Sequence, residues 1–142
     1  MNPRPFAIAL LLLVLAPALA HAQDLREFTQ RFTLSWARND AGSLVGSSAP
    51  SGIAMDIDGR AVGPLKSRQA AAMLRRLFDE RETISVTLLN RRELPGEPRR
   101  AWLELIWVRR ARGTTIPERI TVFVALVAEQ DDWHITEIRL LP

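Results

Sequence analysis

The stretch "GIAMDIDGRAVGPL" (residues 52–65) carries the clearest local structural signal in the chain. Its first half, "IAMDI", alternates apolar positions with small or polar ones, which is the period of a strand with one apolar face. Asp58 and Gly59 follow, a pair that suits a two-residue type I′ turn, and "RAV" supplies a return strand. The stretch therefore predicts a β-hairpin with its tip at Asp58 and Gly59.

Asp56 and Asp58 also suggest a second interpretation, because paired carboxylates can hold a calcium ion. A calcium loop needs further oxygen ligands at alternate positions and a later bidentate glutamate. The four residues after "DIDG" begin with Arg60 and contain no side-chain oxygen ligand. We therefore interpret the pair as part of the hairpin tip and expect no metal site here.

Helical patterns lie on both sides of the hairpin. Asp24 and Glu27 form a capping-box pattern before a helix over about residues 24–39, and Ser67 can N-cap a second helix. A loop rich in serine, glycine and proline separates the first helix from the hairpin, with a short helical turn around Leu44. Apolar residues at helical spacing support both helices: Leu25, Phe28, Phe32 and Trp36 in the first, and Ala70, Leu74, Leu77 and Phe78 in the second.

After Glu82 the apolar pattern changes to period two and predicts four further strands. These cover residues 84–89, 101–108, 120–127 and 133–141, with turn signals between them. Helices first and long strands later indicate an α+β fold in which helices pack on one face of an antiparallel sheet. Several of the strands are apolar on both faces, so the second face needs a cover, either a partner subunit or the curvature of the sheet itself.

The N-terminal residues have the layout of a secretory signal peptide. A short positive region at Arg4 is followed by an apolar run, and Ala20-His21-Ala22 matches a cleavage pattern. We expect residues 1–22 to be removed and residues 23–142 to form a single domain, exported to the periplasm or secreted, with no stable membrane anchor. The sequence has no cysteine, which excludes disulfides, thiolate metal sites and cysteine nucleophiles.

The charge pattern argues against a nucleic-acid partner. The formal net charge is only +3, and the basic residues are spread among acidic ones, as in "LRRLFDERE". A nucleic-acid-binding protein would present a clustered basic face. His134 is the only histidine after residue 22, so a histidine-rich metal centre is not expected either, and no cofactor is predicted.

These features together resemble the nuclear transport factor 2-like superfamily, which includes ketosteroid isomerases and polyketide-cyclase-like proteins. The resemblance rests on the first helix, the hairpin "MDIDGRAVG", the helix "SRQAAAMLRRLF" and the closing strand "DDWHITEIRLL". It implies helices on a strongly curved antiparallel sheet, a cone with a pocket at its open end. It also implies a homodimer through the outer sheet face. One fold of this kind hosts enzymes, ligand binders and assembly modules, so it implies no single activity.

An isomerase-like activity would need a carboxylate base and an oxyanion hole built from a tyrosine and a protonated aspartic acid. The sequence has no tyrosine, so the principal donor is missing. Glu104 or Glu137 can serve as the base if it is buried, because desolvation favours the protonated form. Otherwise each points outward or pairs with an arginine such as Arg139 or Arg109.

We first expect an exported, non-catalytic domain that binds a small apolar ligand or a protein partner and dimerises. The alternatives are a cyclase- or isomerase-like enzyme and an envelope docking module that uses the outer sheet face. Trp102 and Trp107 are separated by an odd number of residues, so they should face opposite sides of their strand. The expected pocket residues are Phe32, Trp36, Met55, Trp102, Glu104 and Glu137.

Overall fold

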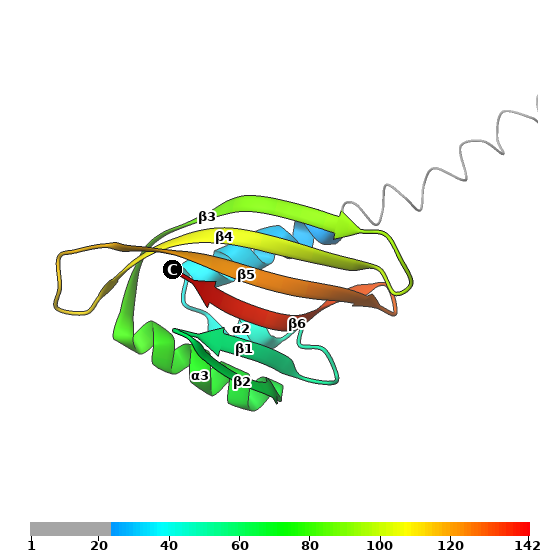
Figure 1. Cartoon of the computed structure of the whole chain (residues 1–142), viewed down its shortest axis with the longest axis horizontal. Helices are drawn as coiled ribbons and strands as arrows, with labels where there is room; N and C mark the ends of the chain where they lie inside the picture. The colour runs from blue at the N-terminus through cyan, green and yellow to red at the C-terminus, as the bar shows by residue number, and fades with distance from the viewer. Residues whose placement is uncertain (1–23) are drawn as a thin grey trace, which may run out of the picture.

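The computed structural model describes residues 24–142, and the predicted signal peptide (residues 1–22) lies outside the described residues. Six strands form one sheet in the order β2-β1-β6-β5-β4-β3 (Figure 1). The N-terminal helix (residues 24–37) is followed by α2 (Ala41–Val45), β1 (Ile53–Ile57), β2 (Arg60–Leu65), α3 (Ser67–Glu80), β3 (Arg81–Leu94), β4 (Arg100–Ala111), β5 (Glu118–Glu129) and β6 (Asp132–Leu141). The predicted α+β class is confirmed.

The β1–β2 hairpin forms as its sequence predicts. Ile57 pairs with Arg60, and the two residues between them have positive φ angles, 53° at Asp58 and 79° at Gly59. Positive φ at both central residues defines a type I′ turn, whose twist matches that of the flanking strands. The hairpin interpretation of Asp58 is therefore confirmed.

One strand pair differs from the expected antiparallel sheet. β1 lies parallel to β6, while the other neighbouring strands are antiparallel. Antiparallel neighbours in this chain are joined by short connections, but β1 and β6 are separated by most of the chain. No turn therefore constrains their relative direction, and local sequence patterns cannot predict it.

Several element boundaries differ from those predicted, and two of them have a clear physical reason. The N-terminal helix ends at residue 37, because Asn39 takes a left-handed φ of 55° that a helix cannot continue through. β3 is far longer than the predicted strand at 84–89, since it begins directly after α3 and continues through "NRREL". That second half is polar and largely exposed, so it carries no period-two apolar signal.

The helices and the sheet form two layers with the core between them. In β4 the inner positions are buried and alternate with half-buried outer positions, and β5 repeats this pattern. Register shifts in the β3–β4 and β5–β6 ladders mark irregularities of the bulge type, which bend strands and increase twist. The bent sheet curves over the N-terminal helix (Figure 1). Within residues 24–142, none of the helices has the length and apolar character needed to cross a membrane.

Gly52 provides a test of how closely the hairpin packs against its own entry loop. Its φ is 97°, and a Cβ at this position would lie 2.8 Å from the carbonyl oxygen of Leu65. We expect Gly52→Ala to lower the free energy of unfolding by about 2 kcal/mol, because backbone strain and the close contact add. Urea unfolding measures the change.

Gly42→Ala is the matched control, because Gly42 lies in α2 and a Cβ added there would have Asp40 Oδ1 as its nearest neighbour, 3.7 Å away. Alanine favours helices over glycine, so this variant should be as stable as the wild type or more stable by up to about 1 kcal/mol. Equal stability of the two variants would contradict the close packing at Gly52.

Candidate functional site

The interior between the helices and the sheet is occupied by a cluster of three aromatic side chains. Trp36 of the N-terminal helix, Phe78 of α3 and Trp107 of β4 meet edge to face, with ring centroids 5.4 to 6.0 Å apart. Edge-to-face pairs at this distance contribute about 0.5 to 1.5 kcal/mol each beyond the burial of their area. Trp36 and Trp107 are completely buried.

A short hydrogen-bond chain fixes this cluster at one end of the sheet. The indole Nε1 of Trp107 donates to Thr83 Oγ1 at 3.0 Å, and Thr83 donates to Asn39 Oδ1 at 2.7 Å. The chain connects β4, β3 and the residue just beyond the N-terminal helix. It therefore holds the helix end against the first part of β3.

The six expected pocket residues do not come together. Phe32, Trp36 and Met55 are buried in the core, as part of one continuous apolar cluster. Trp102, Glu104 and Glu137 lie on the opposite, outer side of the sheet. The strand registers show this, because Glu104 and Glu137 pair with Phe123 and Ala125, which occupy half-buried outer positions of β5.

Neither candidate base is buried. Glu104 is half-buried on the outer side, and the Glu137 side chain is 38% exposed with its carboxylate 3.2 Å from Arg139. Glu137 thus forms the ion pair that the sequence offered as the alternative to a catalytic role. Within residues 24–142, no group of three or more His, Cys, Asp or Glu side chains is placed to hold a metal ion.

The two strand tryptophans face opposite sides, as predicted. Trp107 is in the core, whereas Trp102 stacks at a tilt on Phe123 of β5, with centroids 6.1 Å apart. The guanidinium of Arg139 lies 5.9 Å from the Phe123 ring. We call this solvent-facing side of the sheet the outer face; its central residues are Trp102, Ile106, Val108, Phe123 and Ala125, with Glu104, Glu137 and Arg139 beside them.

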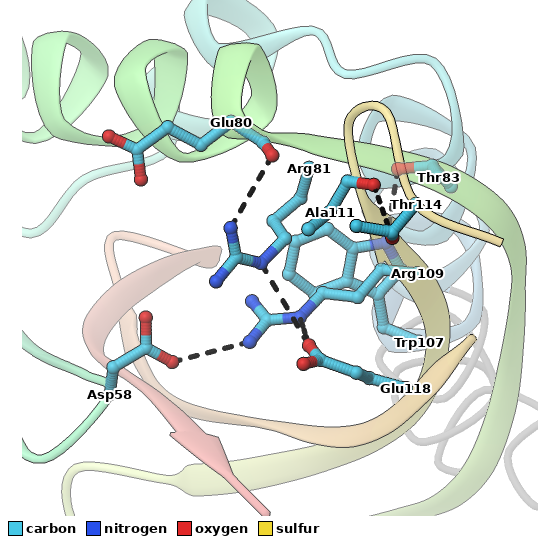
Figure 2. Close-up of polar contacts among 9 residues, drawn as sticks. All are labelled: Asp58, Glu80, Arg81, Thr83, Trp107, Arg109, Ala111, Thr114 and Glu118. Atoms are coloured by element: carbon cyan, nitrogen blue, oxygen red, sulfur yellow. Dashed lines mark hydrogen bonds and ion pairs between the residues drawn. The ribbon is translucent and has the colours of Figure 1, made fainter. Parts of the chain in front are cut away.

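A buried arginine joins the hairpin tip to the strands (Figure 2). Arg109 of β4 is only 3% exposed and pairs with Asp58 at 3.3 Å and with Glu118 at 3.2 Å. Its guanidinium also lies 4.8 Å from the centre of the Trp107 ring. Arg81 approaches Glu118 from the other side, at 3.8 Å. Two arginines thus face two carboxylates, so the cluster has no net formal charge. It is also partly solvated, because Asp58 and Glu118 are about half exposed.

This arginine cluster was missed by sequence reasoning, although a signal for it exists. Arg109 falls in phase with the inward-facing positions of β4, which alternate along the strand up to Trp107. A charged residue in phase with buried ones requires a partner, and Asp58 supplies one. The aspartate of the hairpin tip thus has a structural role beyond its turn.

The groups with shifted pKa values lie outside both the core and the centre of the outer face. Two hydrogen bonds from Arg110, at 2.9 and 3.0 Å, hold the pKa of Glu82 below its ordinary value and raise that of Arg110. Hydrogen bonds from the side chain and backbone of Ser43 lower the pKa of Asp40, the N-cap of α2. Each shift reflects an ion pair or a helix cap, which are structural interactions.

The sequence matches no protein-family model and no curated protein, so the comparison with known proteins rests on three-dimensional structure. A DUF4783 family protein from Bacteroides uniformis superposes with a TM-score of 0.66 at 11% identity, over 79% of this chain and 94% of that chain. A nuclear transport factor 2 design has a TM-score of 0.62 at 17% identity, over 81% and 94%.

A hypothetical protein with a ketosteroid isomerase-like fold from Catenulispora acidiphila, in complex with trimethylamine, has a TM-score of 0.61 at 14% identity. That match covers 82% of this chain and 85% of that one. At these identities the likenesses show the fold alone. The chain has the nuclear transport factor 2-like fold, which confirms at the level of fold the resemblance noted in its sequence.

The Arg109 contacts predict that loss of the arginine destabilises the protein more than loss of its partner Asp58. Arg109→Ala should lower the free energy of unfolding by about 2 to 3 kcal/mol, because it removes buried charge-assisted hydrogen bonds and the contact with Trp107. Asp58→Asn should cost less than about 1 kcal/mol, since this partner is half exposed and Glu118 still pairs with the arginine. Urea unfolding of both variants tests the order, and equal losses would contradict a buried role for Arg109.

Proposed function

We propose that the protein is a non-catalytic binding module that self-associates through the outer face. The observation that supports this most strongly is the distribution of aromatic side chains. The interior, where this fold can hold a pocket, contains a continuous apolar core that includes Trp36, Phe78 and Trp107, while Trp102 and Phe123 lie on the outer side of the sheet. An aromatic pair in the middle of an uncovered sheet is the composition expected at the centre of an interface.

The charges on the outer face favour a second copy of the same chain as the partner. A two-fold interface brings the same surface of each subunit together, so the surface must complement itself. The outer face carries acidic residues, Glu104 and Glu137, and basic Arg139, so each subunit can offer both signs to the other. The apolar centre supplies the burial, and the mixed charges can supply the register.

A catalytic role has less support from the geometry. The base of an isomerase-like enzyme needs a desolvated carboxylate beside a cavity, and Glu104 and Glu137 both lie on the open side of the sheet. The signal-peptide layout of residues 1–22 supports placing the module in the periplasm or outside the cell.

Trp102→Arg tests the proposed interface. A central aromatic residue of an interface contributes about 2 kcal/mol or more, so the dimer dissociation constant should rise about thirtyfold or more. Sedimentation velocity over a range of micromolar concentrations measures the constant for both proteins. A wild-type protein that stays monomeric at high micromolar concentration would refute the proposed self-association.

Ile116→Arg is the matched control, because Ile116 is 76% exposed and lies in the connection between β4 and β5, away from the outer face. It introduces the same charge at an exposed apolar position. Its dimer constant should equal that of the wild type. A rise equal to that of Trp102→Arg would show that added charge alone weakens association.

A further inference from the structure

An open apolar groove lies between the N-terminal helix and β3, on the inner side of the sheet. Its volume is about 530 Å³, within the range of ligand sites in proteins. Two of its lining residues are large apolar side chains left in solvent: Leu34 is 49% exposed and Leu88 is 37% exposed. The groove is lined by Arg26, Thr29, Gln30, Thr33, Leu34, Ala37, Val86, Leu88 and Arg91.

The two threonines of the groove contribute apolar rather than polar surface. Thr29 Oγ1 donates to the carbonyl oxygen of Leu25 at 2.7 Å, and Thr33 Oγ1 donates to that of Thr29 at 2.8 Å. Because each hydroxyl donates its proton to a carbonyl oxygen of the preceding helical turn, that proton is not available to a ligand in the groove. The methyl groups then remain as the apolar part of each side chain, so Gln30 is the only uncharged polar side chain of the lining without such a bond.

Both arginines of the groove lie at the same end. The hydrogen bond between Thr83 and Asn39 places the end of the N-terminal helix beside the start of β3. Figure 1 shows the start of the blue helix near the arrowhead of β3, and Arg26 and Arg91 line the same groove, so the two elements run in opposite directions. From Ala37 back to Arg26 the helix rises about 16 Å. From Val86 to Arg91 the strand advances the same distance, about 16 Å, which brings Arg26 and Arg91 to the same end of the groove.

The groove is therefore apolar along its length and carries two positive charges at one end. Its lining contains no acidic residue to neutralise Arg26 and Arg91. Neither arginine forms an ion pair among the described residues. An occupant that matches this pattern has an apolar body and an anionic head, and a carboxylate suits the planar guanidinium groups.

The groove suits an alkyl chain better than a peptide. A peptide laid along it would need partners for its backbone amides, which are costly to bury unpaired. The helix backbone is internally bonded and its threonine hydroxyls are committed. The outer edge of β3 is interrupted by two register shifts, at Thr83/Ser85 and Leu88/Asn90, which disfavour the addition of a regular strand. An alkyl chain has no such requirement.

We propose that this groove is a binding site for an unbranched alkyl carboxylate, a single-chain anionic amphiphile. The alkyl chain lies along Leu34, Ala37 and Leu88, and the carboxylate lies at the end that carries Arg26 and Arg91. The site is on the inner side of the sheet, opposite the outer face. It therefore stands independently of the proposed self-association.

Titration calorimetry of the full-length mature protein with dodecanoate, below its micelle concentration, tests the site. We expect one equivalent to bind per chain, and dodecylamine to bind at least tenfold more weakly because its head has the wrong charge. Arg91→Glu should weaken dodecanoate binding at least tenfold. Ala37→Trp should also weaken it at least tenfold by filling the groove, and since Ala37 is exposed the variant should still fold.

Arg92→Glu is the control, because Arg92 is the next residue of β3 and pairs with Trp102, which places it on the other side of the strand. It should bind dodecanoate as the wild type does, and so should the Trp102→Arg variant. Equal affinity for dodecanoate and dodecylamine would overturn the proposal, as would binding unchanged by Ala37→Trp. Binding to anionic lipid vesicles without binding to free dodecanoate would also overturn it, because the site would then be a membrane contact.

Discussion

Trp36, Phe78 and Trp107 come from three different elements and meet edge to face in the core. Their contact is the constraint on which the arrangement of the two layers depends. It fixes the N-terminal helix and α3 against β4, and the bond from Trp107 to Thr83 adds β3 to the same assembly. Rings of this size leave little room for anything else at the place where they meet.

Because the core is packed, the candidate binding sites lie on the surface of the protein. The sheet separates two candidate binding surfaces with different chemistry. The outer face has a tilted aromatic pair with acidic and basic neighbours, a pattern suited to another copy of the same surface. The groove beside the N-terminal helix is lined by aliphatic side chains and two arginines, with no acidic residue in the lining, a pattern suited to a small amphiphile. A change on one side of the sheet need not disturb the other.

Much of the fold was predictable because its signals are local. Asp58 and Gly59 define a turn through their own backbone preferences, and the helices show their apolar faces within a few residues. Alternation along β4 placed Trp102 and Trp107 on opposite sides, but it did not say which one was inside. That choice depends on Trp36 and Phe78, which are far away in the chain. The polar half of β3 was missed because an exposed strand needs no apolar period.

The site was less predictable than the fold, because it depends on contacts between residues that are far apart in the chain. The six expected pocket residues were separated by the sheet, because a list of aromatic and acidic residues does not say on which side each strand places them. The amino-acid sequence by itself determined the fold class, the hairpin, the helices and the absence of thiol and tyrosine chemistry. Tertiary structure decided the parallel pairing of β1 with β6, the partners of Arg109 and the filling of the interior. Each of these depends on contacts between distant residues, which no local pattern encodes.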